Sequence, residues 1–346
     1  MLARGKTERI PGAAGYREAL GEILARHLPE GVDAIGLKTV HGGPRFRGSF
    51  RVTDEVLEAM REFVPAAPLH NPIYITAMEI IRQLAPEIPL VAVFETGFHS
   101  TIPDAAAFYG VPGEWREKYG IRRYGFHGAS HQYVSERVPE MLARPKDTLR
   151  LISCHLGGSS SICAIHGGKS ADTTMGFSPQ SGLENATRHG DVDPFAVLFL
   201  MDRLGLSPGR MREELLRQGG LAGLSGISGG DVRDLEAAGT PEARLALDVF
   251  AYQVRKTVGA YAAAMGGLDA VAFTGGIGEN SASLRQACCQ ELEFLGIRLD
   301  PERNRQQTGD RVISPEGAPV AVLALATNEE LIVARETYRQ IVDRGT

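Results

Sequence analysis

The segment from residue 149 to 165 constrains the fold of this chain more than any other. Two apolar runs, at 149–155 and 161–166, flank a short turn of glycine and serine. Small residues in such a turn allow backbone N–H groups to approach an anion closely. A plain β-hairpin explains the paired glycines on their own. The placement of His155 directly before the turn favours a buried hairpin whose turn binds a phosphate group.

Strand and helix patterns alternate along the rest of the chain, which is typical of the α/β class. Helical spacing of apolar residues predicts helices over 15–28, 53–64, 72–84, 242–265 and 281–295. Short apolar runs predict strands at 32–36, 89–94 and 269–273. Thr53 is a plausible N-cap of its helix. A length of 346 residues suits two domains better than one core.

Composition and charge exclude several classes of protein. Hydrophobic residues make up 43% and charged residues 23%, as in ordinary globular proteins. The net charge of −5 gives no reason to expect nucleic acid or an anionic membrane as a partner. No apolar run reaches the roughly 18 residues of a membrane span. The four cysteines lack zinc-ligand or disulfide-framework spacing, so we expect a cytoplasmic protein.

A second stretch rich in histidine runs from residue 124 to 131. It places His127 and His131 four residues apart, on one face if a helix begins there. His127 is a candidate donor to a phosphoryl group in transfer, because such reactions are helped mainly by positioned positive donors. The alternative is a buried structural histidine. The same two interpretations apply to His41 and His70.

Residues 273–280 combine the end of a strand, a glycine turn and the start of a helix. Backbone without Cβ can lie flat against a nucleotide, and a helix start favours negative charge. Tight packing between strand and helix is an equally good explanation. The segment does not follow the dinucleotide-binding pattern, and the chain has no Walker lysine motif.

Three charged residues are further candidates. The guanidinium of Arg188 suits a carboxylate or phosphoryl group, although an ion pair with Asp191 or Asp193 is the usual fate of such an arginine. Glu95 ends a strand and Glu329 begins the last helical pattern, so both are candidates for ordering Mg²⁺. The alternatives are a turn carboxylate and a partner of the helix dipole.

Taken in order along the chain, these motifs resemble the acetate kinase family. The matching stretches are 124–131, 154–161, 169–179, 187–188 and 274–280. The resemblance implies a two-domain duplicated ribonuclease-H-like fold shared with actin and sugar kinases, with the cleft between the domains. It implies that 1–97 plus 331–346 form the first domain, and that 98–330 form the nucleotide-binding and dimerisation domain. The implied activity is reversible, Mg²⁺-dependent transfer of the ATP γ-phosphoryl to acetate, giving acetyl phosphate and ADP, by a homodimer.

The resemblance also assigns roles. His127 stabilises the phosphoryl in transfer, and Arg188 holds acetate or acetyl phosphate. Lys38 and Glu95 are two further catalytic residues, and Glu95 and Glu329 serve the metal. The implied substrate-pocket residues are Val40, Leu69, His70, Phe126 and Pro179. The implied nucleotide-binding residues are His155, Gly157, Gly158, Ser159, Gly275, Gly276, Ile277, Gly278 and Asn280.

The chain departs from the family pattern at four places. It starts after the family's first strand and its Asn-x-Gly-Ser-Ser-Ser phosphate loop, so we expect an N-terminally truncated first domain and a natural start upstream of Met1. Lys38, Glu95 and Gly158 replace the family's arginine, aspartate and asparagine. Two alternatives therefore stay open: a propionate or other short-chain acyl kinase, and a catalytically weakened nucleotide-binding homologue.

The helix expected at 242–265 carries two apolar stripes. One passes through Leu245 and Tyr252, and the other through Phe250 and Val254. A helix that is apolar on more than one face needs a second covering surface. That surface is either a dimer partner or a sheet and helix of the same domain.

Overall fold

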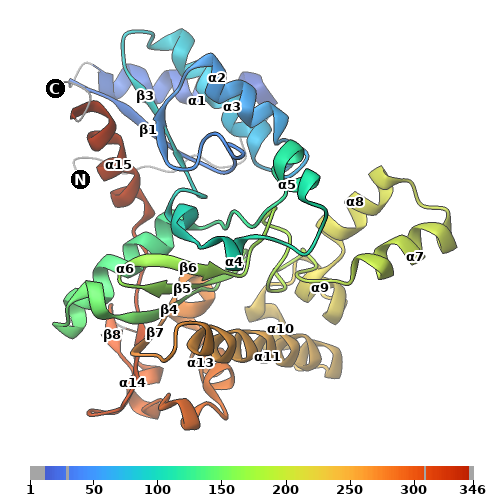
Figure 1. The fold of residues 1–346 in the computed structure, drawn as a ribbon, viewed down its shortest axis with the longest axis vertical. Helices are drawn as coiled ribbons and strands as arrows, with labels where there is room; N and C mark the ends of the chain where they lie inside the picture. Colours follow the sequence, from blue (N-terminus) through green and yellow to red (C-terminus); the bar gives the residue numbers. More distant parts are fainter. Residues whose placement is uncertain (1–11, 29–30, 308, 343–346) are drawn as a thin grey trace. The chain divides into compact units, whose positions relative to one another are not determined.

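The computed structural model describes residues 12–28, 31–307 and 309–342 (Figure 1). The chain divides into two compact units, Met1–Gly97 with Glu329–Thr346, and Phe98–Asn328. Each unit contains a β-sheet with helices, which confirms the predicted α/β class. Within the described residues, no helix combines the length and the apolar character needed to cross a lipid bilayer.

The first unit is built on a three-stranded sheet in the order β1–β3–β2. Its strands are β1 (Ile35–Thr39), β2 (Ser49–Arg51) and β3 (Leu90–Phe94), and its helices are α1 (Gly12–His27), α2 (Asp54–Glu62), α3 (Asn71–Leu84) and α15 (Glu329–Val342). The central strand β3 is parallel to β1 and antiparallel to β2. Side chains of α2 and α3 form the core with β3, among them Val56, Met60 and Met78.

Two details of the first unit bear on the sequence predictions. Thr53 caps α2 as expected, because its hydroxyl accepts a hydrogen bond from the N–H of Val56. The strand predicted at 32–36 begins later, at Ile35, and continues to Thr39. Lys38 therefore lies within a strand.

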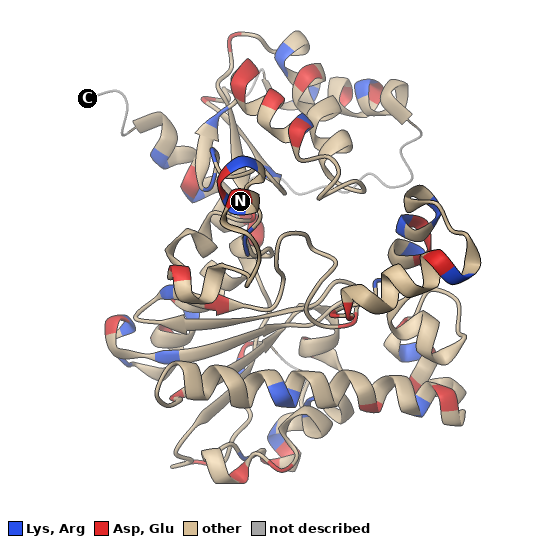
Figure 2. Cartoon of the chain, turned by 45° about the vertical axis from the view of Figure 1, so that its right-hand side comes forward, with Lys and Arg blue, Asp and Glu red and all other residues tan. Residues whose placement is uncertain are grey.

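The second unit contains a six-stranded sheet in the order β6–β5–β4–β7–β9–β8. The strands are β4 (Arg150–His155), β5 (Ser161–His166), β6 (Lys169–Thr173), β7 (Ala270–Thr274), β8 (Arg311–Val312) and β9 (Ala321–Ala324). β4, β7 and β9 run parallel, and β4 and β5 form the predicted hairpin. Charged side chains lie mainly on the helices, whereas the strands of this sheet carry few (Figure 2).

Helices cover both faces of this sheet (Figure 1). On one face α6 (Gly128–Leu142) packs against Leu151 and Ile165. On the other, α9 (Gly220–Ser225), α11 (Pro241–Ala264) and α13 (Ala282–Cys289) pack against Ile152 and Phe273. The remaining helices are α4 (Asp104–Ala107), α5 (Gly113–Tyr119), α7 (Pro194–Leu204), α8 (Pro208–Arg217), α10 (Val232–Ala238), α12 (Gly275–Asn280) and α14 (Pro301–Arg305).

The two apolar stripes of α11 differ in their burial. Phe250 and Val254 are buried against the sheet, as the intramolecular alternative requires. Leu245 and Tyr252 stay on the outside, 54% and 55% exposed. The helix predicted at 281–295 is wrong beyond residue 289, because the backbone leaves the helical conformation at Gln290, which has φ of −59° and ψ of 138°.

Candidate active site

Parallel pairing of β4 and β7 brings two predicted nucleotide segments together. His155 is in register with Thr274, so the turn after β4 and the start of α12 lie at the same edge of the sheet. The N–H groups of Ile277 and Gly278 donate to the carbonyl of Leu156 over 2.9 and 3.1 Å. The glycine turn that begins α12 is thus joined directly to the turn of residues 156–160 between β4 and β5, which we call the phosphate turn after its predicted role.

Packing explains one glycine of this edge but not all of them. Gly275 has φ of 78°, and a Cβ there would lie 2.6 Å from the carbonyl oxygen of Leu156. Gly158 and Gly276 differ, because both are exposed and a Cβ at either would meet nothing within 4 Å. A Cβ on Gly157 would lie 3.9 Å from the backbone nitrogen of Gly276. The two turns therefore present adjacent, accessible backbone.

The phosphate turn is braced by residues that the sequence did not single out. Ser160 Oγ donates to the carbonyl of Gly157 over 3.0 Å. The N–H of Ser160 donates to Oδ1 of Asn185, which is fully buried. On α12, the Asn280 side chain donates to the carbonyl of Gly276 over 2.8 Å. Asn280 thus supports its own turn.

His127 stands at the start of α6 with a strained backbone. It occupies the N-cap position with φ of 55°, a left-handed conformation that costs a non-glycine residue about 1–3 kcal/mol. Gly125 also has a positive φ, and a Cβ there would lie 2.5 Å from the ring of His99. His99 Nε2 lies 2.9 Å from the carbonyl oxygen of Phe126. The surrounding loop therefore holds His127 in its unfavourable conformation.

Four histidine rings lie close together on the face of the larger sheet that α6 covers: those of His99, His127, His131 and His155. The rings of His127 and His155 stack with centroids 4.3 Å apart. Serine hydroxyls hold both rings: Nδ1 of His127 is 2.9 Å from Ser161 Oγ, and Nδ1 of His155 is 2.8 Å from Ser130 Oγ. His127 and His155 are half-buried, whereas His99 and His131 are completely buried. The structural interpretation therefore fits the two inner histidines.

Arg188 is a half-buried cation whose Nη1 donates to the carbonyl of Pro179 over 2.9 Å. Across the described part of the chain, no ion pair involves Arg188. Asp191 instead accepts a backbone N–H bond, and Asp193 caps α7, so the alternative of an ion pair with either is wrong. Burial lowers the pKa of the guanidinium.

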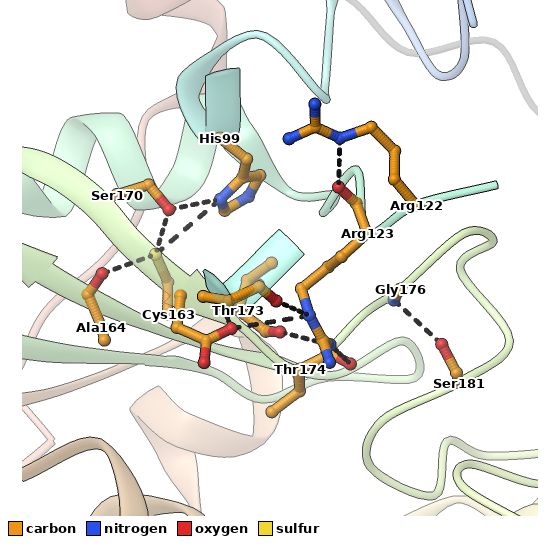
Figure 3. A network of polar contacts seen from close by, with 12 residues as sticks. His99, Arg122, Arg123, Cys163, Ala164, Ser170, Thr173, Thr174, Gly176 and Ser181 are labelled. Carbon is orange, nitrogen blue, oxygen red and sulfur yellow. Dashed lines mark hydrogen bonds and ion pairs between the residues drawn. The ribbon is translucent and has the colours of Figure 1, made fainter. Parts of the chain in front are cut away.

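A polar network fixes the segment that leads from β6 to Arg188 (Figure 3). Arg123 donates from Nη1 to the carbonyls of Thr173 and Thr174 over 2.8 and 3.1 Å, and Asp172 lies 3.6 Å from its Nε. The N–H of Gly176 donates to Ser181 Oγ over 2.9 Å. These contacts fix both ends of the loop that contains Pro179, the anchor of Arg188.

In the first unit, Lys38 joins the two candidate metal ligands. Its Nζ is 2.5 Å from Oε2 of Glu329 and 3.6 Å from Oε1 of Glu95. Burial alone would lower the pKa of Lys38, but the two carboxylates outweigh it and raise that pKa. No group of three or more His, Cys, Asp or Glu side chains among the described residues could hold a metal alone. Two carboxylates do fit Mg²⁺ that takes its other ligands from water and phosphate.

The substrate-pocket residues expected from the sequence are divided between the units. Val40, Leu69 and His70 belong to the first unit, and Phe126 and Pro179 to the second. Val40 and Phe126 are buried, whereas Leu69 is 39% exposed. Neither unit alone contains the whole set.

Residues 13–335 match the model of the acetokinase family. The acetate kinase of Shouchella clausii is 45% identical over 96% of this chain and 86% of its own length. The propionate kinase of Citrobacter rodentium is 46% identical over 96% of this chain and 85% of its own. The solved structure of Porphyromonas gingivalis acetate kinase superposes with a TM-score of 0.87 at 40% identity, covering 94% of this chain and 84% of that one. The predicted fold is thereby confirmed, and the chain belongs to the acetokinase family.

Proposed function

We propose that this protein is an acetate kinase, which transfers the γ-phosphoryl of ATP reversibly to acetate and gives acetyl phosphate and ADP. Arg188 carries the proposal, because it is a half-buried cation without a carboxylate partner among the described residues. Such a guanidinium suits a small carboxylate or a phosphoryl oxygen through paired hydrogen bonds. In the same proposal Phe126 and Pro179, which belong to the same unit as Arg188, line the pocket for the methyl group.

The geometry around His127 supports phosphoryl transfer. This transfer needs few covalent steps from the protein and depends on donors held where charge develops. The ring of His127 is fixed by its stacking on His155 and its bond to Ser161. The accessible backbone at Gly158 and Gly276 supports phosphate and adenosine binding at the same sheet edge.

Mg²⁺ is the cofactor of this proposal. Glu329 and Glu95 would hold the ion, which when bound neutralises charge on the phosphate oxygens. Lys38 pairs with both carboxylates and adds a fixed positive charge beside them. It replaces the arginine that the family resemblance leads us to expect there.

We further propose a cytoplasmic homodimer. Its support is exposed apolar surface on the second unit: Phe195 and Phe199 of α7 are 76% and 65% exposed, and Leu245 and Tyr252 of α11 are also exposed. Sedimentation at micromolar concentration tests this assembly. A mass near the 37.2 kDa of one chain would reject the dimer.

A coupled assay for ADP tests the activity. Purified protein with ATP, MgCl₂ and acetate should form ADP only when both acetate and Mg²⁺ are present. The matched control is Arg188→Met, which should still bind ATP but show no saturation with acetate. If the protein binds ATP and no acetate-dependent turnover is seen, the weakened-homologue alternative replaces the proposal.

Propionate is the second candidate substrate, favoured by the Citrobacter rodentium relative. The two acids differ by one methylene, which a hydrophobic pocket distinguishes by about 10–200-fold. We expect kcat/KM to be higher for acetate. A higher value for propionate would assign this chain to the longer acid.

A further inference from the structure

The face of the larger sheet that α6 covers becomes polar toward the edge with the glycine turn. On this face the side chains change in parallel on two strands, from Leu151 through Ser153 to His155 on β4, and from Ile165 through Cys163 to Ser161 on β5. The first turn of α6 places His131 over this polar end. A buried imidazole among hydroxyls is unusual for a face that is otherwise core.

His131 connects the core to His127 through hydroxyl groups. Its Nε2 lies 2.8 Å from Ser161 Oγ, and its Nδ1 lies 2.9 Å from Ser153 Oγ. The same Ser161 Oγ is 2.9 Å from Nδ1 of His127. Ser153, His131 and Ser161 are completely buried. A continuous chain of four polar groups therefore ends at the half-buried ring of His127.

Proton counting limits how this chain can be arranged. A hydroxyl has one proton to donate, and a neutral imidazole has one N–H on either nitrogen. His131 is neutral, because burial lowers its pKa and the nearby His99 and His155 act in the same direction. Ser161 could also accept from both rings, but its own buried proton would then have no acceptor among the described residues, where the two rings are its hydrogen-bond partners. The three hydrogen bonds must therefore all point outward toward His127, or all point inward toward Ser153.

The outward direction is the better one. In the inward direction the Ser153 proton has no acceptor, because His131 is the single hydrogen-bond partner of that hydroxyl within the described residues. A buried donor without a partner incurs its full desolvation penalty. In the outward direction Ser153 donates to Nδ1 of His131, Nε2–H of His131 donates to Ser161, and Ser161 donates to Nδ1 of His127. Every buried proton then has an acceptor.

We infer that His131 is a positioning residue, which through Ser161 fixes the proton of neutral His127 on Nε2. His127 then offers an N–H from the nitrogen opposite Ser161 without becoming an imidazolium. Its ring is at the same time held against rotation, since Nδ1 is an acceptor in a defined bond. The consequence for catalysis rests on the proposed function, whereas the location of the proton does not.

Long-range ¹H–¹⁵N NMR of the full chain labelled with [¹⁵N]histidine tests the inference directly, because it separates protonated from unprotonated ring nitrogens. The signals of His127 are assigned by their loss in His127→Gln. At pH 8 we expect His127 to be protonated on Nε2 alone. His131→Phe and Ser161→Ala should each give a mixture of both forms. A proton on Nδ1 in the original protein, or an unchanged spectrum in both variants, would overturn the inference.

The conservative variant His131→Gln provides the matched control, because its amide N–H can take the place of Nε2–H toward Ser161. We expect His131→Phe to lower kcat by about 10–100-fold, as loss of an orienting partner does, with KM for acetate within about 2-fold. His131→Gln should recover most of kcat and the original spectrum. If glutamine and phenylalanine give the same loss, His131 only fills space. If no form of the protein shows turnover but the spectra are as expected, the proposed kinase activity is wrong and the inferred location of the His127 proton is retained.

Discussion

Two neighbouring glycines of α12 separate a packing role from a ligand-binding role. Gly275 has a left-handed backbone, and a Cβ there would lie 2.6 Å from the carbonyl oxygen of Leu156. Gly276 is exposed, and a Cβ there would meet nothing within 4 Å. Replacement of glycine by alanine should therefore lower the stability of the protein at position 275, and leave it unchanged or raise it at position 276.

For Gly275→Ala the expected loss of stability is the sum of two effects. A left-handed alanine costs roughly 1–2 kcal/mol, and overpacking against a fixed carbonyl costs typically 1–3 kcal/mol. The total of about 2–5 kcal/mol should lower Tm by roughly 4–20 °C for a unit of this size. KM for ATP is expected to rise as well, because Leu156 precedes the phosphate turn.

For Gly276→Ala the fold should be unchanged or more stable by up to about 1 kcal/mol, since alanine favours a helical backbone. The added methyl group occupies the surface proposed for the nucleotide, so KM for ATP should rise by about tenfold or more, equivalent to about 1.4 kcal/mol. Thermal melting and steady-state kinetics on both variants suffice. A stable Gly276→Ala protein with an unaltered KM for ATP would refute the placement of the nucleotide, and an undisturbed Tm in Gly275→Ala would refute the packing argument.

Three further substitutions test single side chains. His127→Ala should lower kcat by about 10²–10³-fold with little change in KM for acetate, because its contact strengthens in the transition state; an unchanged kcat would make it a structural histidine. Arg188→Met should lower kcat/KM for acetate by about 10²-fold in steady-state assays, the equivalent of a charged hydrogen bond, without loss of Tm, because a half-buried charge that has no carboxylate partner among the described residues is removed. Burial opposes ionisation of Asp269, but hydrogen bonds from Arg150 and Arg144 outweigh it and lower its pKa from 3.8 to about 2. Asp269→Asn should therefore lose about 1–2 kcal/mol of unfolding free energy at pH 7, after allowance for solvent screening. This stabilisation is present above pH 4 and disappears as the pH falls toward 2, so urea melts of the two proteins should converge there; a constant difference contradicts the assignment.

The features predicted well from the sequence are those encoded by neighbouring residues. The hairpin of β4 and β5, the cap of α2 by Thr53 and the long helix α11 follow from local periodicity and local hydrogen bonding. The end of α13 is not predicted, because the apolar pattern continues past residue 289, whereas the backbone leaves the helix at Gln290. Apolar periodicity indicates which residues are buried, but it does not indicate at which residue a helix ends.

The contacts that organise the candidate site could not be read from the sequence. Lys38 and Glu329 are 291 positions apart, and Ser160 meets Asn185 only because the loop after β6 folds back to the phosphate turn. In the sequence Ser161 is a small residue at the start of the second apolar run, and only the pairing of β4 with β5 places it opposite His155 and beside His131 of α6. Such pairings depend on strand order and helix placement, which a single sequence does not specify.

The last helix gives the chain an order of assembly. α15 lies directly on β1, where a Cβ on Gly36 would come within 2.1 Å of Thr337 Oγ1, and it brings Glu329 to Lys38. During synthesis the first unit must therefore wait for α15, which is made after the whole second unit, while 98–328 form a continuous segment with its own core. Because domains generally fold as units during synthesis, the second unit should fold before the first is complete. The apolar faces of β1 and β3 would meanwhile be open to chaperones, and truncation before α15 would leave them so permanently.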